Sequence, residues 1–408
     1  MTTTIANPRS ALTFIFITLM IDAMGIGLIL PVMPTLIREI TGGDFGDAAV
    51  WGAIMSSIFA IMQVIFGPIV GSLSDRYGRR PVLLISLAVV CVDFIIMGLA
   101  NTIGLLLVTR IVGGIATATQ ATASAFIADI SPPEKKAANF GLVGAAFGIG
   151  FVLGPVIGGL LADFGHRTPF FAAATLAAAN LVFGFFVLPE TVTDKIRRPF
   201  TLARANPFGA LAQISKLPGL GRLLLIVFLY EFAFIVYPAV WAYFTPERFG
   251  WSETMVGASL GGFGISMAIV QGVLIRWIIP RFGESKTIIY GMLFNVVIFL
   301  VLTFLANGTL ALLLTPISAF GAVVTPALQG MMSQRAADNQ QGELQGVITS
   351  FKAIAMILSP LVMSGLFFLF TRDSGIYLPG APFALSMVLV IACFVVFLWP
   401  ERRRDVTT

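Results

Sequence analysis

The stretch GPIVGSLSDRYGRR, residues 67–80, carries the most information about the fold of this chain. Gly67 and Gly71 stand four residues apart, a spacing that places both on one helix face and lets a second helix approach closely. Asp75 lies where the apolar run ends and suits the positive N-terminal end of a helix. The stretch therefore predicts the end of a membrane helix followed by a tightly built basic turn.

The composition of the whole chain agrees with a membrane location. The chain has 408 residues, of which 57% are hydrophobic and 11% charged, and its mean hydropathy is +0.95. A soluble domain carries roughly 25% charged residues, so we expect most of this chain to lie in lipid. The net charge of +5 and the pI of about 9.4 are explained by Lys and Arg in loops on one side of the membrane. We therefore expect no nucleic-acid partner.

Few residues of the chain suit enzyme chemistry. His166 is the only histidine, which excludes a His-rich metal site and a His-based hydrolytic triad. Cys91 and Cys393 both fall inside apolar runs, so they are predicted to be core residues and not a disulfide. We expect no enzyme activity, no resident metal and no cofactor.

Twelve apolar stretches are long enough to cross the bilayer as helices, which takes about 20 residues each. They lie near residues 11–34, 50–72, 81–100, 103–127, 137–162, 168–188, 219–245, 254–280, 286–306, 308–331, 343–370 and 380–400. The breaks between them carry turn residues, as at Asn307 and Gly308. The sequence therefore predicts an all-α membrane protein with twelve transmembrane helices.

Basic residues are distributed unequally between the two sides of this bundle. With the N-terminus inside, 18 of the 25 Lys and Arg residues fall in cytoplasmic segments. The outer loops hold only Arg38, Arg167, Arg248 and Arg372. Because cytoplasmic loops attract Lys and Arg, both termini are predicted to be cytoplasmic.

The longest polar connection runs from about residue 190 to 217 and divides the spans into six plus six. We predict a first six-helix lobe over residues 1–189, a cytoplasmic linker over 190–217, and a second lobe over 218–408. Two pseudo-symmetric lobes of this kind place a substrate site between them, near the middle of the membrane.

The stretch of residues 67–80 closely resembles the signature loop between helices two and three of the major facilitator superfamily. Residues 281–284 form a faded copy of it, which fits an internal repeat. Within the loop, Arg79 can bridge to a carboxylate such as Asp129 at the cytoplasmic end of helix four. The resemblance implies a gating role for Gly67, Gly71, Asp75, Arg76, Gly78, Arg79, Arg80 and Asp129.

Residues 144–159, GAAFGIGFVLGPVIGG, form a second motif. Glycines four residues apart make a smooth helix face, and Pro155 bends the helix. The string resembles the antiporter motif found in exporters of the superfamily, which importers usually lack, and so it implies export. Ordinary packing of small residues is the alternative. The residues of the motif are Gly150, Gly154, Pro155, Gly158 and Gly159.

The run DAMGIGLILPVMP, residues 22–34, is similar to the first helix of the tetracycline/proton antiporters. Shorter matches extend the similarity over nearly the whole chain, at residues 62–66, 248–257 and 326–330. The resemblance implies a drug:proton antiporter of the bacterial inner membrane, whose substrate can be a tetracycline–Mg²⁺ chelate.

Two positions depart from that family. Asn295 stands where the family has an aspartate tied to coupling, and Met267 stands where it has a histidine. Asn295 cannot carry a proton and Met267 offers no imidazole. The family's second-half coupling site is therefore missing here, and transport of tetracycline itself stays an open question.

Five ionisable residues fall at membrane depth, where a charge costs at least about 2.5–3.5 kcal/mol and is a functional candidate. They are Asp22, Asp93, Arg110, Glu231 and Lys352. Asp22 has no obvious partner on its own helix, and a carboxylate in a low-dielectric cavity suits proton uptake and release. The residues of each pair, Asp93 with Arg110 and Glu231 with Lys352, lie a similar number of residues from the ends of their helices. They are therefore predicted to lie at the same depth in the membrane and to form ion pairs. We assign all five to proton coupling, and a static ion bridge is the alternative for each pair.

The predicted substrate site is neutral and aromatic. Gln63 can bond a substrate or pack against another helix. Tyr237, Trp241 and Phe263 can line an aromatic pocket or face lipid. Met267 and Asn295 complete the set.

Together these features predict alternating access, with protons entering from outside and a small lipophilic solute moving out. The expected partners are that solute, protons and the bilayer, and we expect a monomer. The rival readings are a facilitator or importer of a small metabolite on the same fold, and an intramembrane enzyme, for which no nucleophile–base set is present.

Overall fold

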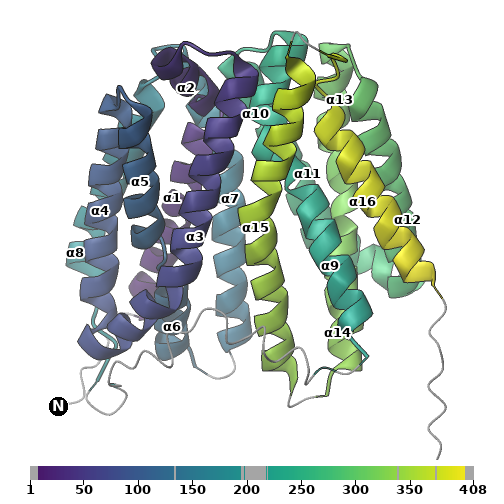
Figure 1. The fold of residues 1–408 in the computed structure, drawn as a ribbon. Coiled ribbons are helices and arrows are strands. Elements are labelled where there is room, and N and C mark those ends of the chain that lie inside the picture. Colours follow the sequence, from purple (N-terminus) through teal and green to yellow (C-terminus); the bar gives the residue numbers. More distant parts are fainter. Residues whose placement is uncertain are drawn as a thin grey trace, which may run out of the picture.

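The elements of this chain are helices throughout the part that the computed structural model describes (Figure 1). The structure describes residues 8–132, 135–193, 197, 217, 219–337, 340–372 and 375–399. The predicted all-α membrane class is confirmed. The predicted linker lies mostly outside the described residues.

The first half of the chain forms six spans. Its helices are α1 (Pro8–Ile29), α2 (Met33–Thr41), α3 (Phe45–Tyr77), α4 (Arg79–Leu99), α5 (Ile103–Ala116), α6 (Gln120–Ile130), α7 (Lys136–Ala162) and α8 (Thr168–Val187). The first predicted span, residues 11–34, is corrected, because α1 ends at Ile29 and α2 is a separate short helix. Pro31 has no N–H to continue the helix, which explains the break.

The second half repeats this plan. Its elements are α9 (Gly221–Phe234), α10 (Val236–Phe249), α11 (Glu253–Ile269), the π-helix η4 (Val270–Leu274), α12 (Ile275–Phe304), α13 (Gly308–Ser318), the 3₁₀-helix η5 (Ala319–Val323), α14 (Val324–Arg335), α15 (Gln341–Thr371) and α16 (Ala381–Leu398).

The number of spans depends on one glycine. Eleven helical stretches of the described chain are long and apolar enough to cross a membrane, and one of them covers residues 253–304. That stretch turns at Gly283, whose φ of 74° favours glycine, so it makes two spans. The twelve predicted spans are therefore confirmed.

Matching spans of the two halves are interrupted. The fourth span breaks at residues 117–119 between α5 and α6, and the tenth breaks at η5 between α13 and α14. The seventh span breaks at Ile235, between α9 and α10. Gly78 and Gly283 both adopt a positive φ at the corresponding loops, 112° and 74°. The agreement supports an internal repeat, and interrupted helices of this kind border the substrate route in transporters built from repeats.

The helices form two bundles side by side (Figure 1). We call α1 to α8 the first lobe and α9 to α16 the second lobe. The face where α3 ends and α4 begins is the loop face, at the bottom of Figure 1, and the opposite face is the α2 face.

Contacts between the lobes gather toward the α2 face. Helix α7 packs on α11, and α3 packs on α15. Thr254 of α11 donates a hydrogen bond to the Gly159 carbonyl (3.1 Å). Ser57 of α3 donates to the Ile357 carbonyl (2.7 Å). The lobes are therefore closed against each other on this side.

Candidate functional site

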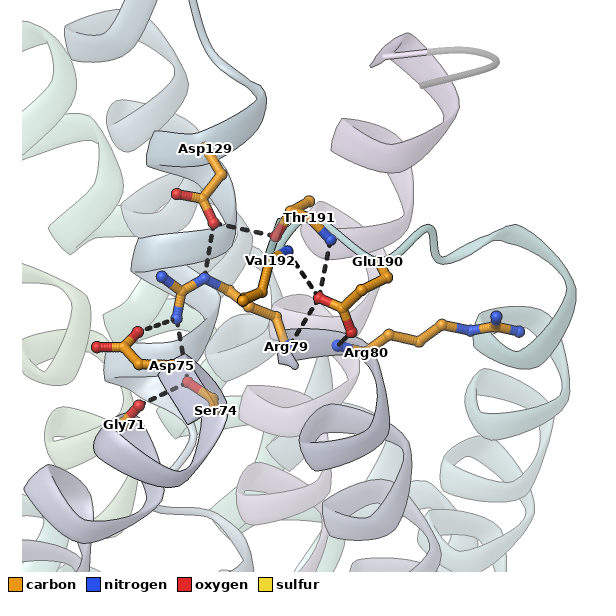
Figure 2. A network of polar contacts seen from close by, with 9 residues as sticks. All are labelled: Gly71, Ser74, Asp75, Arg79, Arg80, Asp129, Glu190, Thr191 and Val192. Atoms are coloured by element: carbon orange, nitrogen blue, oxygen red, sulfur yellow. Dashed lines mark hydrogen bonds and ion pairs between the residues drawn. The ribbon is translucent and has the colours of Figure 1, made fainter. Parts of the chain in front are cut away.

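Arg79 is the centre of the signature loop (Figure 2). Its Nη1 donates to Asp75 and its Nε donates to Asp129, both at 2.7 Å. Its Nη1 also donates to the Ser74 hydroxyl at 3.1 Å. Hydrogen bonds between guanidinium and carboxylate groups are charge-assisted and geometrically specific. The predicted bridge to Asp129 is confirmed, and it joins the start of α4 to the end of α6, while the contact with Asp75 joins α4 to the end of α3.

Glu190, which the sequence reasoning missed, organises the other side of this loop (Figure 2). Its carboxylate accepts hydrogen bonds from the N–H groups of Arg79 (3.0 Å) and Arg80 (3.2 Å), the first residues of α4. It also accepts from the N–H groups of Thr191 (2.9 Å) and Val192 (2.8 Å). A carboxylate at a helix N-terminus satisfies donors that have no partner inside the helix and meets the positive end of its dipole. The only sequence signal is an acid just after the sixth apolar stretch.

The three loop glycines have different surroundings. A Cβ on Gly78 would meet the Glu190 carboxyl, and its φ of 112° favours glycine. A Cβ on Gly71 would make an ordinary contact with Ala121 at 3.4 Å, whereas one on Gly67 would meet nothing within 4 Å. Gly71 therefore lies beside α6, whereas no helix approaches Gly67 in this conformation.

The remaining charged groups of the loop stay within the first lobe. Asp75 was expected at a helix N-terminus, but it lies in the last turn of α3 and pairs with Arg79. Arg80 donates to the Phe185 carbonyl at 2.7 Å, and the Arg76 guanidinium lies over the Tyr77 ring. The loop is thus a self-contained network in this conformation.

One stripe of the α7 motif packs against α1. A Cβ on Gly154 would lie 2.6 Å from the Met24 carbonyl oxygen, and Gly150 and Gly158 meet the α1 backbone as closely, at Met20 and Leu28. Only glycine allows such an approach between helix backbones. These three glycines therefore fix the architecture of the first lobe.

A neighbouring stripe of the same helix forms the contact between the lobes. A Cβ on Gly159 would lie 2.7 Å from the Glu253 carbonyl oxygen of α11, and Gly257 meets Pro155 across the same interface. Gly148 lies on this stripe nearer the loop face, where a Cβ would meet nothing within 4 Å. Phe147 beside it is 49% exposed. The lobes therefore touch at the α2 face and stand apart at the loop face.

Asp22 lies in the middle of α1, on the helix face that carries Thr18 one turn away. The Thr18 hydroxyl donates to Asn180 Oδ1 of α8 at 3.2 Å, and both residues are buried. The Asp22 carboxylate makes no hydrogen bond or ion pair within the part of the chain that the structure describes. A carboxyl group in this setting can exist in either protonation state without breaking a salt bridge.

Asp93 and Arg110 form the predicted pair. Arg110 Nη2 lies 3.4 Å from Asp93 Oδ2, joining α4 to α5, and Asp93 is 5% exposed. The Arg110 guanidinium also lies over the Phe59 ring, 5.3 Å from its centroid. An apolar cavity of about 300 Å³ between α4 and α5 borders Asp93. The pairing is confirmed, and its burial means that removing one partner would strand the other charge.

Glu231 and Lys352 form the second predicted pair. Lys352 Nζ of α15 lies 3.1 Å from Glu231 Oε1 of α9, and the Thr325 hydroxyl of α14 donates to the same oxygen at 3.4 Å. Glu231 is 20% and Lys352 33% exposed, so water or a solute can reach both side chains. Phe228 and Phe351 pack against each other nearby, with ring centroids 5.8 Å apart and the rings tilted by 53°. The site combines opposite charges with aromatic surface, which suits an amphipathic organic molecule.

The three aromatic residues predicted to bind substrate lie together between the lobes. Tyr237, Trp241 and Phe263 line a small cavity of about 40 Å³ with Leu30 and Phe151 of the first lobe. Trp241 is 1% exposed and donates from Nε1 to the Ser259 hydroxyl at 3.0 Å. Lipid contact, the alternative weighed for this group, is wrong because all three are buried.

The other residues assigned to substrate are placed apart from that cavity. Asn295 is fully buried inside the second lobe, where its Nδ2 donates to the Tyr230 hydroxyl at 2.8 Å. Gln63 donates to the Thr117 hydroxyl at 3.1 Å, beside the break in the fourth span. Met267 lies in α11, outside the cavity that Tyr237 lines. The structure thus gives Asn295 and Gln63 partners within their own lobes.

Comparisons with known proteins agree with this geometry. The model of the Major Facilitator Superfamily matches residues 15–360 and 223–408. The chain is 38% identical to the class C tetracycline resistance protein of Escherichia coli, covering 88% of this chain and 90% of that protein. It is 33% identical to the class B protein of Escherichia coli, covering 92% and 94%. It is 28% identical to multidrug resistance protein 2 of Bacillus subtilis, covering 94% and 93%.

Solved structures show the same architecture. The crystal structure of the human organic anion transporter MFSD10 (TETRAN) matches with a TM-score of 0.68 at 26% identity, covering 96% of this chain and 99% of that one. The nucleoside transporter NupG matches with a TM-score of 0.76 at 13% identity, covering 96% and 99%, which shows the fold alone.

Proposed function

Because the chain belongs to the Major Facilitator Superfamily, we propose that it exports a small lipophilic organic molecule of the drug type in exchange for protons. One observation carries the proposal: Asp22, Asp93 and Glu231 all lie within membrane spans of a two-lobed bundle that is closed at one face only. Acids at this depth are costly and mark ion or substrate pathways. The relatives named for tetracycline and multidrug resistance point to export of drugs.

We place the loop face in the cytoplasm of a bacterial inner membrane, with both termini inside. The excess of Lys and Arg in the segments on that side supports this orientation. The described conformation is then open to the inside, ready to receive a solute from the cytoplasm or the inner leaflet. The proposed role is transport by a monomer without a cofactor, and not catalysis.

The exchange rests on proton binding at Asp22 and on a switch at Glu231. A proton from outside neutralises Asp22, and solute binding from inside releases that proton to the cytoplasm. In the second lobe Asn295 has no proton to exchange, so Glu231 is the acid available there. Protonation of Glu231 would free Lys352, and the partial exposure of both side chains supports such a step.

The test is expression in a bacterium deficient in drug pumps, followed by resistance and accumulation measurements over a drug panel that includes tetracycline with Mg²⁺. Lowered accumulation of at least one drug, lost with Asp22→Asn, is the expected result. Raised accumulation of a drug or metabolite would instead favour import or facilitated entry. Unchanged accumulation of the whole panel would contradict drug export.

A further inference from the structure

The single histidine of the chain lies where the two lobes close. His166, in the turn between α7 and α8 of the first lobe, places its Nδ1 3.2 Å from Glu253 Oε1 of the second lobe. The Thr35 hydroxyl of α2 donates to the same oxygen at 2.6 Å. Two side chains of the first lobe thus converge on one carboxylate of the second.

Glu253 is well placed to receive them. It is the first residue of α11, whose N-cap Ser252 accepts a hydrogen bond from the Met255 N–H. A carboxylate in the first turn also meets the positive end of the helix dipole. Thr254, next along α11, donates to Asp163 at 3.0 Å. The start of α11 is therefore one of the points at which the second lobe contacts the first through side-chain hydrogen bonds.

We propose that Glu253 is the latch of the α2-face gate and that His166 makes this latch sensitive to protons. The contacts of Glu253 with Thr35 and His166 cross between the lobes, so they exist only while this face is closed. Histidine gains its positive charge between pH 8 and 5. Once charged, His166 pairs with Glu253 across the gate, and acid therefore favours the closed state.

The charged groups around His166 support the expectation that acid favours the closed state. Glu253 faces it from α11, and Asp163 stands at the end of α7. Arg167 follows it in sequence, but its guanidinium is held by Glu39 at 3.0 Å and by the Gly98 and Ala100 carbonyls. The neighbours that do not already have a cationic partner are acidic, so a charged His166 would face carboxylates across the gate.

On the orientation proposed above, the α2 face meets the outside, where the exchanged protons arrive. A low external pH would then favour closure of the α2 face once the transporter has bound a proton from outside. The latch itself does not depend on the substrate or on the direction of transport, so a readout of lobe position tests it separately from the proposed function.

The experiment measures closure of the α2 face by double electron–electron resonance. Spin labels replace Phe164 in the first lobe and Ile376 in the second, which are 83% and 77% exposed. The background carries serine at Cys91 and Cys393, the chain's two cysteines. Tyr377 beside the second label donates to Glu247 at 3.0 Å. Burial and the neighbouring Glu247 carboxylate raise the pKa of Tyr377 to about 12. This residue next to the second spin label therefore stays protonated between pH 5 and 8.

The protein is reconstituted in nanodiscs without substrate and scanned from pH 8 to 5. We expect the ratio of closed to open populations to rise with acid, and Glu253→Gln or His166→Gln to reduce that ratio at pH 5 by roughly two- to five-fold, as for an exposed ion pair. Asp47→Asn removes a carboxylate at the same face within the first lobe and leaves Arg167 paired with Glu39, and it is the matched control. It should leave the ratio unchanged.

Size-exclusion profiles identical to that of the parent protein confirm that the variants are folded. Equal closed fractions at every pH in the parent, Glu253→Gln and His166→Gln proteins would overturn the latch. An equal loss in Asp47→Asn would also overturn it, because the effect would then come from the charge of the face as a whole.

Discussion

Lys352 in α15 lies 3.1 Å from Glu231 in α9, and the two side chains are 33% and 20% exposed. The Asn295 side chain is fully buried beside Tyr230 and has no carboxyl group. Of the five ionisable residues predicted at membrane depth, Glu231 and Lys352 are the two in this lobe, and they pair with each other.

Single changes in this pair should damage transport. Glu231→Gln removes the titrating group, and Lys352→Ala leaves Glu231 without its cation. We expect each to lower the initial rate of drug export roughly tenfold or more. Export rates from preloaded cells, corrected for the amount of protein in the membrane, measure this effect.

The double variant Glu231→Leu/Lys352→Leu separates a switch from a static bridge. A static bridge can be replaced by two apolar residues, and transport should then largely recover. A switch cannot be replaced, so the double variant should stay folded but uncoupled. Full proton-coupled export in the double variant would leave Asp22 and Asp93 as the only coupling acids.

A substitution in the signature loop is expected to change the transport rate more than the affinity for substrate. Asp75 pairs with Arg79 within the first lobe and lies at the loop face, far from the middle of the membrane. Asp75→Asn should therefore slow transport several-fold while substrate binding in detergent changes little. A fall in affinity in proportion to the fall in rate would contradict a gating role.

The glycines of α7 predict two different phenotypes from one substitution. Gly154→Ala would place a methyl group 2.6 Å from the Met24 carbonyl oxygen, and overpacking of this kind costs about 1–3 kcal/mol. Gly148→Ala meets nothing within 4 Å in this conformation, so its midpoint of thermal unfolding should be unchanged.

Closure of the loop face would bring the Gly148 stripe against the second lobe, so Gly148→Val should slow transport without lowering thermal stability. Thermal unfolding in detergent and transport assays on the same preparations provide the comparison. Equal thermal destabilisation by Gly148→Ala and Gly154→Ala would show that the lobes are already packed at both faces.

Asn295 should behave as a structural residue. Its Nδ2 donates to Tyr230 and, at 3.3 Å, to the Gly321 carbonyl in η5. Asn295→Ala removes both donated hydrogen bonds, although the Tyr230 hydroxyl still donates to the Gly321 carbonyl at 2.8 Å, and a lost hydrogen bond costs about 0.5–1.5 kcal/mol. We expect a lower unfolding temperature and unchanged substrate affinity in the folded fraction. A selective loss of affinity would instead assign Asn295 to the substrate site.

The spans and the ion pairs were predictable because both follow from simple spacing. Apolar length predicts twelve spans, and equal offsets on antiparallel or co-directed helices predict that Asp93 meets Arg110 and Glu231 meets Lys352. The reach of Arg79 to Asp129 follows from the loop motif. Each of these depends on local periodicity and on the thickness of the membrane.

What the sequence could not show is which contacts cross between distant segments. Glu190 reaches α4 from the far end of the first lobe, and Glu253 meets His166 only because the lobes are closed on that side. The interruptions at residues 117–119 and in η5 were not predicted either, although Gly113 and Gly114 precede the first and η5 contains Gly321. Such features depend on tertiary packing and on the conformational state, neither of which a hydropathy pattern encodes.

Proton coupling through Asp22 is the central claim, and everted membrane vesicles test it most directly. Respiration acidifies the vesicle lumen, so an antiporter should carry drug inward, uphill, and move protons out. Asp47→Asn, at the start of α3 on the α2 face, is the matched control for Asp22→Asn.

The parent and Asp47→Asn proteins should accumulate drug and partly collapse the pH gradient when drug is added, as read by a pH-sensitive dye. Asp22→Asn, present in equal amount, should do neither. Uphill drug accumulation with proton release by Asp22→Asn would contradict the account.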